Sequence, residues 1–132
     1  MIVDTSALVA IARHETGYES LLQAIVTSSP VQVSAVSALE FGLVLTNKNE
    51  LDERRSTDLL ESWNITVVPF DEAHAKAAIA AHARFGKGRH KAALNFGDCA
   101  AYATAMLAKQ PLLFVGEDFT HTDVVAVPIM RT

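Results

Sequence analysis

Short apolar segments alternate with longer helical segments along this chain of 132 residues, and this alternation limits the folds it can adopt. Helices of ten or more residues between strand-like segments are typical of βα units, in which the strands run parallel. The strand-like segments are mainly apolar, as expected when helices cover both faces of a sheet. The sequence therefore predicts an α/β fold. Because such connections are right-handed, we expect the C-terminal ends of the strands, and any ligand site, at one edge of the sheet.

The same pattern predicts where the elements lie. Strands are expected at residues 1–3, 31–35, 65–70 and 112–116, with 124–129 as a candidate fifth strand. Helices are expected over about 5–13, 16–28, 37–47, 50–63, 72–85 and 96–109. Gly17 marks the break between the first two helices, and Gly86 and Gly88 open a basic loop of sequence GKGRHK.

Composition excludes several classes of protein. Half of the residues are apolar, a fifth are charged and the mean hydropathy is +0.22, which excludes intrinsic disorder. The single cysteine, Cys99, excludes an intramolecular disulfide framework and a cysteine-rich zinc site, and we expect it to be a small buried side chain. No apolar run reaches the roughly 20 residues of a membrane helix, and Asp4 interrupts the first one, so neither a membrane span nor a signal peptide is expected. We expect one soluble cytoplasmic domain.

The charges are unevenly distributed. The net charge is −4, yet Arg84, Lys87, Arg89 and Lys91 stand within eight residues that contain no acid. The rest of the chain therefore carries a net charge of −8. A basic loop on an acidic protein can be a solvated loop, but it also supplies the attraction for a polyanion that the acids cannot.

Four acidic residues stand where strands are expected to end or helices to begin. They are Asp4, Glu40, Asp98 and Asp118. Taken singly, each has a structural explanation: Asp4 as an N-cap, Ser37-x-x-Glu40 and Asn95-x-x-Asp98 as capping boxes, and Asp118 as a turn residue.

Taken together, the four acids point to a bound cation. Four carboxylates about 5 Å apart repel by about 3 kcal/mol per pair at an effective dielectric constant near 20. The sum is on the order of 10 kcal/mol, comparable to the stability of a whole domain, whereas a helix N-terminus offsets only about 0.3–1 kcal/mol per carboxylate. If the acids converge, a divalent cation must neutralise them or some must be protonated. An all-carboxylate site suits Mg²⁺ or Mn²⁺, which can activate water for in-line attack on a phosphodiester.

Four segments in order carry a resemblance to a known family: MIVDTSALVA, SALEFG, NFGDCAAYATA and LLFVGEDFTHTD. Together they resemble the PIN-domain nucleases, and more narrowly the VapC-type toxins of bacterial toxin–antitoxin pairs. The resemblance covers essentially the whole chain. It implies a single domain over residues 1–132 with a three-layer α/β/α fold and a mainly parallel sheet of four to five strands.

The resemblance also implies an activity and a site. In that family the acid of each motif belongs to a metal site that cleaves RNA, so the chain is expected to be an endoribonuclease using Mg²⁺ or Mn²⁺ to activate water. Carried over by position, the catalytic and metal-binding acids are Asp4, Glu40, Asp98 and Asp118, with Asp123 as the alternative fourth acid.

Further expectations concern the substrate and the partners. Ser6 occupies the small hydroxyl position that the family uses near the first acid, and we assign it to substrate binding together with Lys87, Arg89 and Lys91. The family implies a homodimer and a small antitoxin protein, which typically inserts a peptide, often with an arginine, into the acidic groove. A guanidinium suits that groove because it pairs bidentately with carboxylates.

Three other functions remain open to the residues alone. A non-catalytic PIN-like module that binds RNA or protein would be expected to have lost an acid, and none is missing. An aspartate-nucleophile phosphatase requires an acid two residues after the first aspartate, where this chain has Ser6. A receiver-type phosphoacceptor requires its aspartate at the end of an internal strand, whereas Asp98 begins a helix after a glycine-containing loop.

Overall fold

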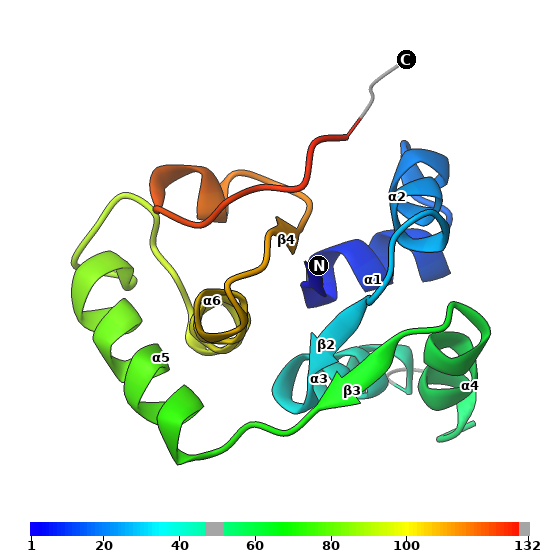
Figure 1. Ribbon diagram of the computed structural model, residues 1–132, viewed down its shortest axis with the longest axis horizontal. Coiled ribbons are helices and arrows are strands. Elements are labelled where there is room, and N and C mark those ends of the chain that lie inside the picture. The colour runs from blue at the N-terminus through cyan, green and yellow to red at the C-terminus, as the bar shows by residue number, and fades with distance from the viewer. Residues whose placement is uncertain (47–51, 130–132) are drawn as a thin grey trace.

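A four-stranded, all-parallel sheet lies at the centre of the computed structural model, which describes residues 1–46 and 52–129 (Figure 1). Its strands, in spatial order, are β3 (Thr66–Val68), β2 (Gln32–Ser34), β1 (Ile2–Val3) and β4 (Leu112–Leu113). Ile2 pairs with Gln32 on one side and with Leu112 on the other, so β1 is central. The α/β class and the parallel sheet expected from the sequence are confirmed.

Helices lie on both faces of this sheet, although its edge strand β3 remains largely exposed. They are α1 (Thr5–Ala12), α2 (Tyr18–Val26), α3 (Ala35–Leu45), α4 (Arg55–Ser62), α5 (Glu72–Phe85) and α6 (Phe96–Ala108), followed by a short 3₁₀ helix, η1 (Asp118–His121). Figure 1 shows α5 and α6 packed side by side. No helix among the described residues is long and apolar enough to cross a bilayer.

The alternation of side chains along β1 divides the core into two parts. Met1 and Val3 point into a cluster with residues of α1, α2, α3 and α4, whereas Ile2 points into a second cluster with α5 and α6. Successive side chains of a strand face opposite sides of a sheet, so a strand covered on both sides must be apolar at every position. The three-layer arrangement follows from this.

Two sequence-based predictions of local structure were wrong. Ser37 does not cap α3: Ser34, the last residue of β2, does so by accepting a hydrogen bond from the Val36 N–H at 3.1 Å. The helix starts directly after the strand, which leaves Ser37 buried inside its first turn. The expected capping box of Ser37 and Glu40 is therefore absent, and Glu40 is free for another role.

The candidate fifth strand is the second error. Residues 124–129 run beside β4 but form only a single bridge, between Leu112 and Ala126. Pro128 lacks the N–H that a longer ladder would need. The fourth strand is also shorter than predicted: β4 ends at Leu113, and Gly116, with φ +98°, lies in the turn that follows it.

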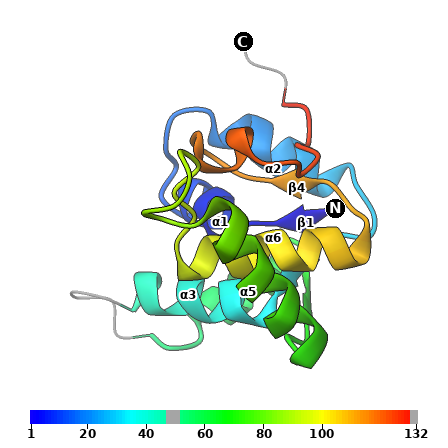
Figure 2. The same cartoon turned by 90° about the vertical axis from the view of Figure 1, so that its left-hand side faces the viewer.

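The ends of β1, β2 and β4 bring three segments to one edge of the sheet. Asp4 follows β1, α3 begins at the end of β2, and Val115 lies just after β4. Figure 2 shows α1 and the start of α6 at this same edge. The candidate functional residues must therefore be sought there.

Candidate functional site

A pocket of about 390 Å³ lies at this edge of the sheet. Its walls come from α1 and the residues that follow it, from α3, from the first turn of α6 and from the segment after β4. Three of the sequence-predicted acids line it: Asp4, Glu40 and Asp98. The Thr5 hydroxyl donates to the Ser37 carbonyl at 3.3 Å and so joins α1 to α3 beside these acids.

Asp4 is the most buried of the acids and is held by Ser6. It caps α1, is 4% exposed, and its Oδ2 accepts hydrogen bonds from the Ser6 N–H at 3.0 Å and from the Ser6 hydroxyl at 2.6 Å. The Ser6 Oγ in turn accepts from the Val115 N–H at 3.0 Å. Burial raises the pKa of Asp4 and the charge of Glu40 adds to this, while the hydrogen bonds from Ser6 oppose it. Ser6 therefore orients Asp4, a role that the sequence did not reveal; its predicted contact with substrate stays a prediction.

Asp98 stands at the start of α6 in the capping box that the sequence predicted. The Asp98 N–H donates to Asn95 Oδ1 at 2.9 Å, and the Asn95 N–H donates to Asp98 Oδ2 at 3.1 Å. The pKa of Asp98 is raised to about 6, mainly by burial and in smaller part by the charges of Asp4, Asp118 and Glu40, while the hydrogen bond from the Asn95 N–H opposes this rise. The Asp98 side chain thus caps α6 and also lines the acidic pocket.

Glu40 reaches the site because residue 97 has no side chain. A β-carbon placed on Gly97 would lie 2.8 Å from both Oε1 and Oε2 of Glu40, so the carboxylate occupies the space that any other residue would fill. Sequence analysis did not single out Gly97. The sequence feature that could have identified it is a glycine next to an acid in the first turn of a helix. Glycine weakens a helix there, so its presence suggests that a side chain would not fit.

The two candidates for the fourth acid, Asp118 and Asp123, have different surroundings in the structure. Asp118 is exposed at the start of η1 and does not line the pocket, but its charge acts on Asp98. Asp123 accepts a hydrogen bond from the Tyr102 hydroxyl and lies 3.6 Å from Arg84 Nη1. Its carboxylate is thus engaged with α5 and α6 and does not line the pocket.

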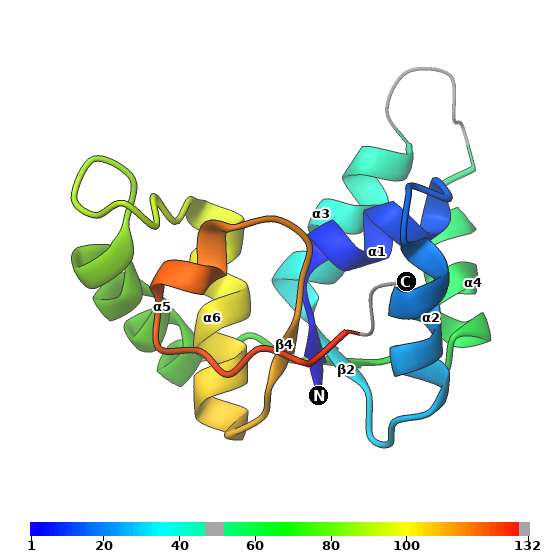
Figure 3. The same cartoon turned by 90° about the horizontal axis from the view of Figure 1, so that it is seen from above.

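One of the four clustered basic residues is paired within the protein, and the other three are exposed. Arg84 pairs with Asp123 and stacks on Phe85, so it is not free to hold a ligand. Lys87, Arg89 and Lys91 are exposed in the loop between α5 and α6, which extends from the edge at which α6 begins (Figure 3). The only cation that lines the pocket among the described residues is Arg13, which sequence analysis passed over.

The chemistry of the pocket fits a hard divalent cation. Its candidate ligands are carboxylates, and their raised pKa values reflect burial and mutual repulsion. Carboxylate oxygens are the ligands that Mg²⁺ and Mn²⁺ prefer. Within residues 1–46 and 52–129, however, no three Asp, Glu, His or Cys side chains are close enough to form a preassembled metal site. Asp4, Glu40 and Asp98 therefore line one pocket, but their side chains are not close enough together to coordinate one ion.

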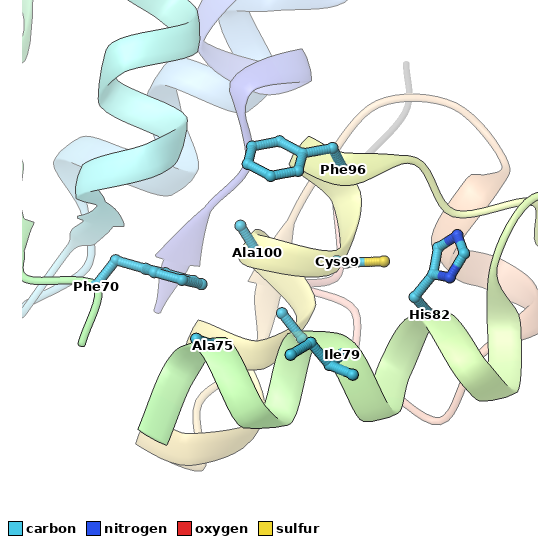
Figure 4. A pocket seen from close by; sticks show the side chains of 8 residues that line it. Phe70, Ala75, Ile79, His82, Phe96, Cys99 and Ala100 are labelled. Carbon is cyan, nitrogen blue, oxygen red and sulfur yellow. The ribbon is translucent and has the colours of Figure 1, made fainter. Parts of the chain in front are cut away.

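A second pocket, of about 410 Å³, lies between α5 and α6 and is lined by apolar side chains such as Phe70, Ile79 and Phe96 (Figure 4). Cys99 lies in its wall and is 4% exposed, which confirms it as a small buried side chain. Burial and the charge of Asp98 raise the pKa of the Cys99 thiol. No carboxylate lines this pocket and thiolate formation is disfavoured, so it lacks the cation ligands that the acidic pocket offers.

Comparisons with known proteins identify relatives along nearly the whole chain. The model of the PIN domain family matches residues 1–125. A ribonuclease VapC from Mycolicibacterium smegmatis is 46% identical over 129 residues, which cover 96% of this chain and 99% of the relative. Ribonuclease VapC28 from Mycobacterium tuberculosis is 44% identical over 126 residues, covering 94% of this chain and 95% of the relative.

Solved structures share the fold at lower identity. VapC20 of Mycobacterium tuberculosis, described as a toxin that cleaves the sarcin–ricin loop, superposes with a TM-score of 0.76 at 16% identity, over 96% of this chain and 97% of that one. A toxin–antitoxin complex from Klebsiella pneumoniae gives a TM-score of 0.72 at 19% identity, over 96% and 95% of the two chains.

Proposed function

Because this chain belongs to the PIN-domain family and is a ribonuclease of the VapC toxin type, we propose that it hydrolyses RNA at the pocket of Asp4, Glu40 and Asp98. Asp118 is the fourth acid of the proposed site, and Mg²⁺ or Mn²⁺ is its cofactor. One observation carries the assignment: Asp4, Glu40 and Asp98, which are far apart in the sequence, line one solvent-open pocket. Burial and the charges of Asp4, Asp118 and Glu40 raise the pKa of Asp98 to about 6, and a divalent cation bound among these acids would relieve their repulsion.

The residues of the pocket have distinct roles in this reaction. Asp4, Glu40, Asp98 and Asp118 would hold the ion. When bound, the ion supplies positive charge that activates water for attack and offsets the charge of the phosphate. Ser6 keeps Asp4 oriented and, by hydrogen bonding, favours its ionised form. Gly97 leaves the space that Glu40 occupies.

Substrate attraction is assigned to the loop between α5 and α6. Lys87, Arg89 and Lys91 are exposed and form no ion pair with any residue that the structure describes. Cations at this edge offset the repulsion between the acids and the RNA backbone. They contribute affinity independently of the base sequence, so the choice of RNA must come from elsewhere in the site.

The proposal extends to partners and to the location of the protein. We propose that residues 1–132 act as one domain in the cytoplasm, as a homodimer inhibited by an antitoxin protein. The exposed apolar side chains of Leu39, Leu43 and Phe96 are surface that such contacts would cover. An arginine of the antitoxin would pair with the pocket carboxylates in place of the ion.

A cleavage assay with purified protein tests the activity. We expect cleavage of RNA with Mg²⁺ or Mn²⁺, loss of cleavage with EDTA, and loss in the variant Asp98→Asn, which keeps the capping hydrogen bond and the fold. The matched control is Asp58→Asn, which changes an exposed aspartate of α4 and should cleave like the wild type. Mapped RNA ends from cells that briefly express the wild type or Asp98→Asn would identify the cut site. A fully active Asp98→Asn would overturn the assignment of the site.

Metal binding provides a readout that does not depend on activity. An ion that binds only the folded state raises its stability by about 2.7 kcal/mol at a hundredfold excess over its Kd. We therefore expect millimolar Mn²⁺ to raise the Tm of the wild type, and to raise it less in Asp98→Asn. Retained RNA binding with neither a Tm shift nor cleavage would contradict the proposal and favour a non-catalytic binding module.

A further inference from the structure

The acidic pocket continues outward as a trough between α1 and α3, beyond the carboxylates. On α1, the residues that line the trough are Ser6, Val9 and Arg13, which lie on one face of the helix because they are spaced by three and four residues. On α3, Glu40 and Val44 are likewise four residues apart and line the facing wall. The lining of the trough is therefore acidic at one end, apolar in the middle, where two valines lie, and carries a guanidinium at the other end.

Arg13 ends this trough without an internal partner. It is the C-cap residue of α1, its side chain is exposed, and it forms no ion pair or side-chain hydrogen bond with any described residue. Arg13 follows Asp4 by nine positions, so with a rise of about 1.5 Å per residue its Cα lies about 13 Å, or about two and a half helical turns, from that of Asp4. Arg13 therefore lies at the opposite end of α1 from Asp4, and its side chain lines the same pocket.

The chemistry of the trough matches one nucleotide of a single strand. A guanidinium binds a phosphate through two parallel hydrogen bonds. Val9 and Val44 are half-buried and present apolar surface between Arg13 and the acids, which suits an unstacked base or its ribose. Glu15 lines the same outer end, and its carboxylate reduces the net attraction for phosphate there, so the guanidinium of Arg13 is the group that must bind it.

We propose that the trough is a subsite for the nucleotide next to the cleaved bond, in which Arg13 binds the neighbouring phosphate and Val9 and Val44 flank the base or ribose. This inference rests on the proposed function, because it takes the pocket carboxylates to be the site of cleavage. Its occupant is an unstacked nucleotide, since a base stacked in a duplex cannot lie in the trough.

The test measures binding of a short single-stranded RNA in an Asp98→Asn background, so that cleavage does not interfere. Replacing Arg13 with alanine should weaken binding about tenfold at low salt, and should reduce the slope of log K against log salt by about 0.7, the value for one phosphate contact on a single strand. Arg13→Lys should keep the slope but bind less tightly, because it keeps the charge and loses the bidentate geometry.

Two further variants separate the parts of the subsite. Val44→Ala should weaken binding without changing the salt slope, because it removes apolar contact alone. Lys109→Ala is the matched control: Lys109 is an exposed cation at the C-cap of α6, at the opposite end of that helix from Asp98, and its loss should change neither quantity. Arg13→Gln serves in place of Arg13→Ala if the alanine variant has a lower Tm.

The outcomes distinguish the subsite from the function it rests on. An active wild type whose Arg13 variants bind RNA with unchanged affinity and salt slope would overturn the subsite and leave the proposed function standing. A wild type that neither binds nor cleaves RNA with Mg²⁺ or Mn²⁺ would overturn both.

Discussion

Gly97 of α6 lies directly against the carboxylate of Glu40 on α3, so close that a β-carbon at residue 97 would come within 2.8 Å of both carboxylate oxygens. These two residues are far apart in the chain, and the packing of α3 against α6 brings them together. Since Asp98 follows Gly97, this contact places the Glu40 carboxylate beside a second acid of the pocket. The missing side chain therefore shapes the site.

The variant Gly97→Ala should separate stability from activity. Alanine favours a helix over glycine by about 1 kcal/mol, and the atoms it meets are at the end of a flexible side chain, which can move aside. We expect unchanged or slightly higher Tm but at least tenfold slower RNA cleavage, because Glu40 is displaced. Gly42→Ala, whose β-carbon would meet Ser56 of α4 rather than an acid, is the control and should keep its activity. Normal cleavage by Gly97→Ala would show that the position of Glu40 does not matter.

Asp98→Asn should make the metal-free protein more stable at neutral pH. The folded-state pKa of about 6 is above the ordinary value of 3.8, so the folded state binds more protons than the unfolded state between these values. Stability is therefore lost as the pH rises through this window. Because the carboxylate is partly exposed and solvent screens it, we expect a gain of about 1 kcal/mol from the substitution.

Thermal unfolding in EDTA checks this prediction. Asp98→Asn should have a Tm a few degrees above that of the wild type at pH 7, and the difference should shrink near pH 4.5, where the folded wild type is largely protonated at Asp98. Excess Mg²⁺ should remove the advantage of the variant. A variant less stable than the wild type at pH 7 in EDTA would contradict the repulsion between the pocket acids.

Ser6→Ala tests the orientation of Asp4. Its hydroxyl donates to the buried Asp4 carboxylate at 2.6 Å and accepts from the Val115 N–H, so its loss removes one hydrogen bond to the carboxylate and leaves the Val115 N–H without this acceptor. The pKa of Asp4 should rise, because that hydrogen bond lowers it. We expect about tenfold slower cleavage at neutral pH and an acid limb of the pH–rate profile displaced to higher pH.

Two comparisons support the interpretation of that result. Ser6→Thr keeps the hydroxyl and should recover much of the activity. Ser62→Ala removes an exposed hydroxyl that bonds the Leu59 carbonyl within α4, and should leave the pH profile unchanged. If the alanine variant at residue 6 loses activity equally at every pH, the hydroxyl does not act through the pKa of Asp4.

The choice between Asp118 and Asp123 can be made with two substitutions. Asp118→Asn should reduce cleavage at least tenfold with little change in Tm, because Asp118 is exposed and acts on Asp98 through its charge. Asp123→Asn should retain cleavage but lower the stability by about 1 kcal/mol, because it weakens the contacts with Tyr102 and Arg84. The reverse pattern would make Asp123 the fourth acid.

Local features of this protein could be predicted from its sequence because their causes lie within a few residues. The capping box of Asn95 and Asp98, the helix over residues 72–85 and the apolar strands follow from periodicity and from short-range hydrogen bonds. Where two residues could each have capped the same helix, the sequence did not show which of them does so. Ser34 and Ser37 both precede or begin a helix, and only the length of β2 decides which of them caps it.

Contacts between distant segments depend on how the helices pack across the sheet. No short stretch of the sequence predicts them. The approach of Glu40 to Gly97, the opening of Arg13 into the acidic pocket and the engagement of Asp123 by Tyr102 are all of this kind. The alternation of strand-like and helical segments was enough to predict an α/β fold, and the positions of the acids after these strands were enough to predict carboxylates at one edge of the sheet. Which acids share a pocket, and which cation faces them, was decided by tertiary packing, because charges interact through space and not along the chain.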